Sequence, residues 1–445
     1  MSQSLRRLKK QLKRQVDQLH SAMLDFVNKI KIIIGDKQLR SRILFVLGVL
    51  ALTRVFASIP IPGVDTNALS QFFSSNQFFG LLNLFSGGGL SGLSIVMLGV
   101  GPYITGSIIM QLLTILSPRL KAMYHEEGQA GRKRVSQYSR ILTVPLAALS
   151  GFGFILLLQR NGVISGLSSL ELVTNITVIV AGSILMMWLG ELISEFGIGN
   201  GTSLIIFAGI VSRLPGAISQ LVFSFTPEQI PVYVAFLVVA LIIILGVVII
   251  TEAERPIPIT YAKQIRGNKV YGGVSTYLPL RVNQAGVMPI IFALSILSFP
   301  GMIANFLSGI QNNIVQSIVG FVNGFLNNLF LYGASYFILV FLFTYFYTAI
   351  TFDPDAISKN LQRSGAFIPG VRPGTSTATH IGNILTRLTL LGALFLGLIA
   401  VLPLIMQTAT GITSVAIGGT GLLIVVSVII DLVKKIEAQV TLREY

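Results

Sequence analysis

Ten apolar stretches, each long enough to cross a bilayer or nearly so, divide this sequence and leave little of it for a soluble core. A transmembrane helix needs about 20 predominantly apolar residues. Charged residues make up 11% of the chain, whereas soluble domains contain about 25%. The sequence therefore predicts an all-α polytopic membrane protein with ten transmembrane helices. The stretches are 43–59, 93–116, 141–158, 172–190, 202–223, 231–250, 286–306, 330–350, 388–406 and 412–430.

The basic residues are distributed unevenly between the two sides that these stretches define. If the connections are assigned alternately to the two sides, 29 of the 32 Lys and Arg residues fall on the side that holds both termini. The other side receives only Arg54, Arg160 and Arg213. Because cytoplasmic loops are enriched in Lys and Arg, both termini are expected in the cytoplasm. Arg54 lies within the first stretch, so it must reach the interface or find a partner.

The ten stretches separate near residue 225 into two sets of five. Because five is odd, two halves with a shared fold would enter the membrane from opposite sides, with the working site between them. The basic N-terminal segment suits equally well a frayed, solvated helix or an amphipathic helix on anionic lipid. The expected units are the segment 1–42, the halves 43–225 and 226–430, the cytoplasmic loops 253–285 and 353–387, and the tail 431–445.

Three segments between the apolar stretches have sequences that favour an ordered backbone. Residues 78–91 are apolar, too short to span the membrane and interrupted by glycines, which favours a re-entrant helix over a surface loop. In the loop Ser364–Gly374, prolines and glycines hold Arg372 in a stiff backbone. Residues 270–279 alternate and turn like a β-hairpin. The two large loops are thus expected to form a basic, aromatic docking surface for acidic or phosphate-bearing partners.

The sequence offers little support for an enzyme. It contains no cysteine and no Walker A motif, and its three histidines lack metal-ligand spacing. We therefore expect no catalytic residues, no bound metal and no cofactor. An ion-coupled transporter of a small solute is the alternative, but such proteins usually need an ionisable group inside the bilayer. Here Glu191, Glu195, Glu252 and Asp431 lie near the ends of apolar stretches.

Collinear motifs from about residue 40 to the end resemble the SecY/Sec61-alpha family of protein-translocation channels. The loop Ser364–Gly374 carries the closest resemblance, and any one of the other motifs alone would be weak. These are Ile59–Gly63, Asn83–Gly88, Gly101–Ile104, Glu127–Lys133, Gly197–Gly201, Tyr261–Lys263, Ala285–Pro289, Thr386–Thr389 and Gly418–Thr420.

The resemblance implies two inverted five-helix halves around a central hourglass pore, closed by a re-entrant plug helix. Such a channel passes unfolded secretory polypeptides and releases apolar segments sideways into lipid. The implied pore ring is Val100, Ile104, Thr202, Ile206, Ile291 and Ile424, of which only Thr202 is not aliphatic. The implied plug, within Phe78–Ser91, contains Phe79, Leu82, Asn83, Leu84, Phe85, Ser86, Gly87 and Gly88.

The family pattern also implies a lateral gate and a set of partners. The second and third spans would face the seventh and eighth, and the polar residues Gln111 and Asn200 would help to hold this seam shut. The expected partners are small membrane subunits resembling SecE and SecG, the SecA motor ATPase, the ribosome, signal peptides and anionic lipids, but not DNA. The implied docking residues for motor and ribosome are Arg255, Lys263, Arg266, Lys269 and Arg372.

Overall fold

The computed structural model describes the greater part of the chain. The described residues are 35–61, 90, 92–125, 127–160, 162, 164, 168–212, 215–216, 219, 230–262, 264–266, 269–271, 273, 275–307, 312–410 and 413–444. The basic N-terminal segment up to residue 34, all the candidate plug residues and Lys263 lie outside these ranges.

Every one of the ten apolar stretches overlaps a helix. In the first half these helices are α2 (Lys37–Ala57), α5 (Gly101–Leu116), α7 (Gly128–Arg160), α8 (Ser169–Phe196) and α9 (Gly201–Val211). In the second half they are α11 (Ile230–Glu252), α12 (Met288–Leu307), α14 (Leu329–Thr351), α16 (Thr375–Thr410) and α17 (Thr413–Glu444). Within the described ranges, four helical runs are both long and apolar enough to cross a membrane: Gly128–Gln159, Ser169–Phe196, Leu329–Arg363 and Thr375–Ile405.

The remaining elements lie between these helices. They are the helices α6 (Pro118–His125), α13 (Asn313–Asn327) and α15 (Pro354–Arg363) and the strands β1 (Glu254–Tyr261), β2 (Gln264–Arg266), β3 (Lys269–Tyr271), β4 (Ser275–Arg281) and β5 (Ala366–Phe367). Side-chain caps start several helices. Ser168 and Glu171 form a capping box at α8, while Asn328 and Asp353 accept backbone N–H bonds at α14 and α15.

The second apolar stretch departs from the sequence prediction. We expected a helix from residue 93, but α5 begins only at Gly101. Residues 92–100 fold as turns, with Gly99 at a φ of 54° and Ser94 paired with Pro60 in an isolated β-bridge. Glycine adopts positive φ without steric cost, and Pro102 then starts the helix in its first turn. The apolar composition was therefore read correctly, whereas the helix boundary was not.

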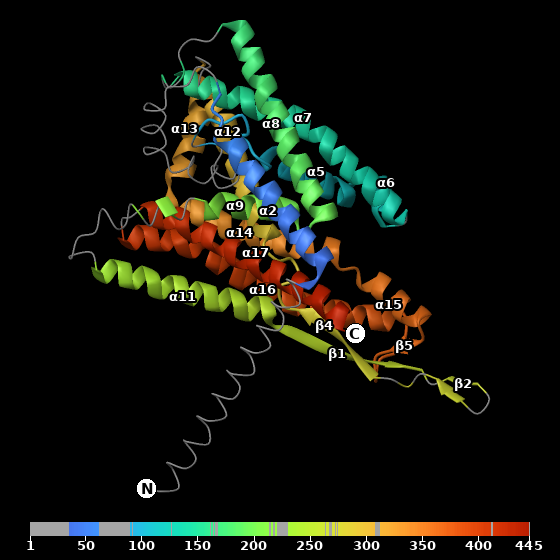
Figure 1. The fold of residues 1–445 in the computed structure, drawn as a ribbon. Helices are drawn as coiled ribbons and strands as arrows, with labels where there is room; N and C mark the ends of the chain where they lie inside the picture. Colours follow the sequence, from blue (N-terminus) through green and yellow to red (C-terminus); the bar gives the residue numbers. More distant parts are fainter. Residues whose placement is uncertain are drawn as a thin grey trace.

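The helices form two groups that meet along α9 and α12 (Figure 1). In one group α5 packs on α7 and α7 on α8; in the other α14 packs on α16, and α17 on both α11 and α16. Contacts between the groups run from α12 to α5 and α7, and from α9 to α17. The largest cluster of buried apolar side chains spans this junction. The junction is therefore where residues from both halves of the chain meet.

The two large loops are joined by one sheet at an end of the molecule (Figure 1). Strand β1 pairs antiparallel with β4 on one edge and with β5 on the other, so β5 links residues 366–367 to the earlier loop. The expected hairpin within 270–279 is wrong in detail, because its two halves pair with earlier strands: β3 with β2, and β4 with β1. Gly273, at a φ of 77°, turns the chain between them.

Candidate functional site

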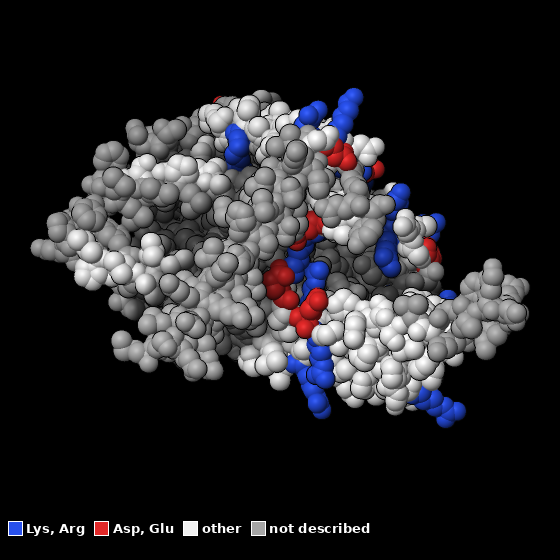
Figure 2. Space-filling model, turned by 60° about the horizontal axis from the view of Figure 1, so that its bottom comes forward, with Lys and Arg blue, Asp and Glu red and all other residues white. Residues whose placement is uncertain are grey.

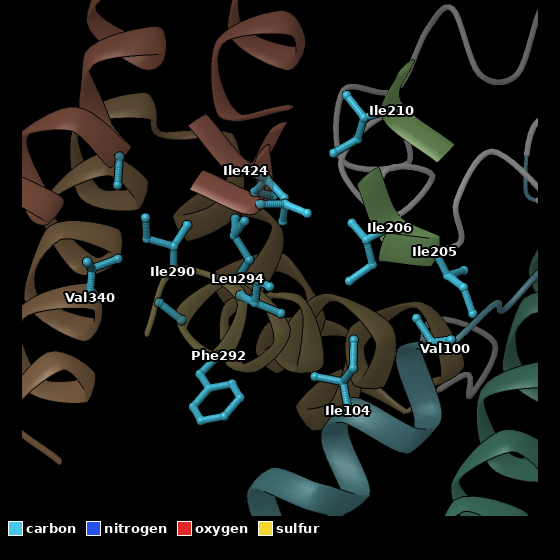
Figure 3. Close-up of a cluster of buried hydrophobic side chains, with 14 of the residues drawn as sticks. Val100, Ile104, Ile205, Ile206, Ile210, Ile290, Phe292, Leu294, Val340 and Ile424 are labelled. Carbon is cyan, nitrogen blue, oxygen red and sulfur yellow. The ribbon is translucent and has the colours of Figure 1, made fainter. Parts of the chain in front are cut away.

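The candidate pore ring lies in the apolar junction between the two groups of helices. Val100 precedes α5 and Ile104 lies in its first turn, Ile206 is on α9, Ile291 on α12 and Ile424 on α17. Each of these five side chains is at most 5% exposed. Figure 3 shows Ile104, Ile206 and Ile424 directed toward a common space beside α12. Aliphatic side chains offer no hydrogen bonds to an ion, so an ion passing among them would have to lose its hydration shell without compensation.

Leu294 belongs to the same group, although the sequence analysis did not single it out. It is 2% exposed and lies three residues after Ile291, which places both side chains on one face of α12. Leu294 and Ile424 belong to the same cluster of buried apolar side chains. The three-residue spacing from Ile291 was a signal that could have identified it.

The other face of α12 packs against α14. The ring of Phe292 makes edge-on contacts with Phe343 and Tyr347, with centroid distances of 6.0 and 5.9 Å. Such edge-to-face pairs add to the stabilisation that burial provides. Helix α12 thus directs Ile291 and Leu294 to the aliphatic group, while its Phe292 packs on α14.

Thr202 stands at the edge of the aliphatic group. It lies one turn before Ile206 on α9 and is half-buried, with its backbone nitrogen and hydroxyl beside Gly190 of α8. Asn200, expected at the lateral gate, is exposed and caps α9 by accepting a bond from the Ser203 N–H at 3.3 Å. Both residues thus help to define the start of the helix that positions Ile206.

A close approach between two glycines fixes the turn from α8 to α9. A Cβ on Gly201 would lie 1.9 Å from the carbonyl oxygen of Gly190, far inside van der Waals contact. The Gly201 N–H donates to the hydroxyl of Ser194 at 2.9 Å, and that hydroxyl donates to the Gly190 carbonyl at 3.0 Å. Ile206 follows five residues later, so this turn determines where it enters the junction.

We expect Gly201→Ala to destabilise the protein by about 1–3 kcal/mol, as overpacking of a tight contact usually does. The measurement is thermal unfolding of the purified protein in detergent. Gly153→Ala on α7 is the matched control, because a Cβ there meets no atom within 4 Å. Alanine is the better helix former, so the control should be neutral or slightly stabilising. Equal melting temperatures for the two variants would refute the close approach.

Of the helices expected to form the lateral gate, α12 contacts both α5 and α7. Gln111 of α5 is half-buried; its Nε2 donates to Ser107 of the same helix at 3.3 Å. Its Oε1 is buried without a hydrogen-bond partner among the described residues. A buried, unpaired acceptor is unfavourable, so an incoming donor would be stabilised at this position.

Three of the charged residues inside or near the apolar stretches have partners in other helices or turns: Arg54, Glu191 and Glu252. Arg54 donates to Ser212 at the end of α9 at 3.1 Å. Glu191 on α8 pairs with Arg140 on α7 at 2.6 Å, and Glu252 at the end of α11 pairs with Lys434 on α17 at 3.0 Å. Figure 2 shows charged side chains gathered on one half of the face in view, several of them bordering a hollow. These carboxylates therefore connect helices near their ends.

The docking residues lie on the sheet and the loop beside it. Arg255 is exposed on β1, and Arg266 and Lys269 are backbone register partners where β2 pairs with β3. Arg372 is exposed, while its carbonyl oxygen accepts a bond from the Thr377 hydroxyl at 2.9 Å. The Ser358 hydroxyl donates to the Gly374 carbonyl at 2.6 Å. Buried Ile368 holds the loop on a core formed with Ile257, Leu280, Ile381 and Leu388.

Comparison with known proteins agrees with this arrangement. The family model described as SecY matches residues 94–433. The chain belongs to the SecY family. A Thermus thermophilus relative, named protein translocase subunit SecY, is 43% identical over 420 residues, covering 92% of this chain and 94% of its own. A Mycobacterium bovis relative of the same name is 42% identical over 428 residues, covering 92% of this chain and 96% of its own.

Solved structures share the fold. The structure titled "The structure of a protein conducting channel" aligns with a TM-score of 0.62 at 19% identity, over 89% of this chain and 92% of its own. Sec61 in the canine ribosome–channel complex aligns with a TM-score of 0.58 at 18% identity, over the same shares. The expected all-α polytopic fold is confirmed, and the chain is a multi-pass membrane protein of the SecY family.

Proposed function

We propose that this chain forms the channel through which unfolded secretory polypeptides cross the cytoplasmic membrane of a bacterium. The observation that carries the proposal is the group of aliphatic side chains contributed by α5, α9, α12 and α17 at the junction of the two halves. Such a group seals the closed channel and contacts a passing chain without recognising its sequence. SecY relatives named as protein translocase subunits support the same function.

Apolar segments would leave the channel sideways through the seam between α12 and the pair α5 and α7. Both faces of this seam are helical, so α12 can separate from α5 without breaking backbone hydrogen bonds of a sheet. Gln111 of α5, whose Oε1 has no hydrogen-bond partner among the described residues, would line this seam. An entering signal helix that displaces the α5–α12 contact would replace protein packing by its own apolar surface. Residues 78–91 would close the channel as a plug.

The partners follow from the topology and the docking residues. Both termini would lie in the cytoplasm with the sheet, and segment 1–42 would contact anionic lipid. Arg255, Arg372 and the basic residues of β2 and β3 would receive the SecA motor or the ribosome; Sec61 was solved in complex with a ribosome. Small subunits resembling SecE and SecG would complete the complex. The chain would act as a channel and not as an enzyme, so its partners or the membrane potential supply the energy.

The transporter alternative has no specific observation in its favour. Glu191 and Glu252 are paired with Arg140 and Lys434, and Asp431 is paired with Lys435 at 2.7 Å. Glu191 and Glu252 connect neighbouring helices and Asp431 is paired within α17, so each carries a cationic partner already and is poorly suited to binding a transported ion.

Site-specific crosslinking tests the channel directly, because the chain contains no cysteine. Ile291→Cys should form a disulfide with a cysteine in a secretory polypeptide stalled during translocation. The crosslink should require a functional signal sequence. Ile338→Cys on α14 is the control, since that side chain is 55% exposed on the apolar outer surface. Absence of the crosslink at both Ile291 and Ile206, with normal insertion of the variants, would exclude the proposed path.

A further inference from the structure

Helix α13 was expected to be part of a connection, yet it is a 15-residue amphipathic helix. Its residues divide into three arcs around the helix axis. One apolar arc faces the protein, with Val319 buried, and the adjacent apolar arc is exposed. The inward arc contains Val315, Val319, Val322 and Leu326; the exposed arc contains Ile314, Ile318 and Phe321, together with the half-buried Phe325; the polar arc contains Asn313, Gln316, Ser317, Asn323 and Asn327.

The inward arc attaches α13 to the helices on either side of it in sequence. Helix α13 contacts both α12 and α14, and Leu326 packs against the main apolar cluster. Figure 1 shows α13 at the end of the molecule away from β1, β4 and α15, running across the direction of α11, α16 and α17. Helix α13 therefore runs across the direction of α11, α16 and α17 while it contacts the two helices that it connects, α12 and α14.

The exposed arc is strongly apolar. Ile314, Ile318 and Phe321 are 72, 51 and 78% exposed. Large exposed apolar residues also flank α13: Phe299 and Ile303 on α12, and Phe330 and Leu331 on α14. The exposed arc thus continues the apolar outer surface of the two membrane-crossing helices that it connects. Contiguous apolar surface of this kind marks a contact with a membrane or another protein.

The surrounding sequence favours lipid as the occupant. No Lys, Arg, Asp, Glu or His occurs between Arg281 and Asp353. A partner protein that docks from water would normally be oriented by charges around an apolar contact. An uncharged helix with one polar arc of Asn, Gln and Ser suits the interface between hydrocarbon and water.

We propose that α13 lies in the membrane–water interface on the side away from the β-sheet, with Ile314, Ile318 and Phe321 inserted among lipid acyl chains. The helix then anchors the end of α12, one side of the proposed lateral seam, to the bilayer. Assignment to the outer leaflet rests on the proposed topology; insertion itself does not depend on it.

Tryptophan quenching by brominated lipid tests the insertion. The chain has one Trp, Trp188, so Trp188→Phe provides a background without tryptophan. In this background Phe321→Trp would report the exposed arc and Asn323→Trp the polar arc. The full chain, with its co-purified partners, is reconstituted in phosphatidylcholine vesicles with or without bromine on the acyl chains.

Fluorescence from position 321 should be quenched at least about twofold more than that from position 323, with a blue-shifted maximum, as expected for a side chain in hydrocarbon. Equal quenching at the two positions would overturn the proposal. Weak quenching at 321 in the complex but strong quenching in the chain alone would also overturn it, because a partner subunit would then cover the arc. Ile318→Trp and Ser317→Trp repeat the comparison if the first pair fails to fold. None of these readouts depends on translocation, so failure of the channel proposal would leave this test intact.

Discussion

The Arg372→Glu variant should fold and insert normally, yet translocate preproteins with SecA at least about 10-fold more slowly than the parent chain. A charged hydrogen bond in an interface contributes about 1.5–3 kcal/mol, and each 1.4 kcal/mol is a factor of ten in affinity. Glutamate also places like charge against an acidic partner surface, which costs more. The assay is protease protection of a preprotein in vesicles containing the purified translocase and motor.

The large expected effect comes from the way the loop is held. Within the loop, the side chains of Ala366 and Ile368 are buried, and the Arg372 carbonyl accepts a hydrogen bond from the Thr377 hydroxyl. Strand β5 attaches the loop to β1 through the pairs Thr260–Phe367 and Tyr261–Ala366. Because this backbone is already ordered, binding at Arg372 costs the rotamer entropy of its side chain but little further backbone entropy. Its replacement should therefore affect binding more than replacement of a charge on a freely exposed helix.

Lys359→Glu on α15 provides the matched control. It makes the same change in net charge at an exposed position of α15, within residues 353–387 but outside the loop Ser364–Gly374. The control should retain most of the parent activity. Equal losses of translocation rate in the two variants would show that the net charge of residues 353–387 determines the rate, and not the position of Arg372. Undiminished translocation by Arg372→Glu would remove this residue from the docking surface.

The sequence predicted the apolar helices well, because a span of lipid needs a run of apolar residues that composition alone reveals. It also placed Arg372 in an ordered loop. The sheet was harder to predict, since β1 and β5 are separated by more than 100 residues and β5 is two residues long. Short strands whose pairing is non-local leave almost no periodic signal.

The remaining differences also have local causes. The late start of α5 depends on positive φ at Gly99, which an apolar run does not reveal. Helix α13 lies outside the ten predicted stretches because Asn, Gln, Ser and Gly interrupt its apolar residues, so they form no continuous apolar run. Gln111 was expected to bond across helices, and its observed bond to Ser107 lies within α5. The rotamer of Gln111 decides whether its amide bonds within α5 or to another helix, and the sequence does not determine that rotamer.

The second large effect is expected at the constriction. Ile424→Asn should shift the channel toward its open state, so that preproteins with defective signal sequences are secreted and resting ion conductance rises. Ile424 is 1% exposed and lies among aliphatic side chains. Burying an amide there without partners costs about 1–3 kcal/mol. That cost falls on the closed state, because an open pore would hydrate the amide, and it changes the closed-to-open ratio by roughly 5- to 150-fold.

Ile429→Asn separates this effect from general destabilisation of α17. Its side chain is 42% exposed on the outer surface of the same helix, so the substitution introduces the same group away from the constriction. The control should keep strict signal dependence and low conductance in planar bilayers. If Ile424→Asn shows the same signal-sequence dependence and the same low resting conductance as this control, Ile424 does not contribute to the seal. The seal would then have to come from the other aliphatic residues at the junction, Leu294 among them.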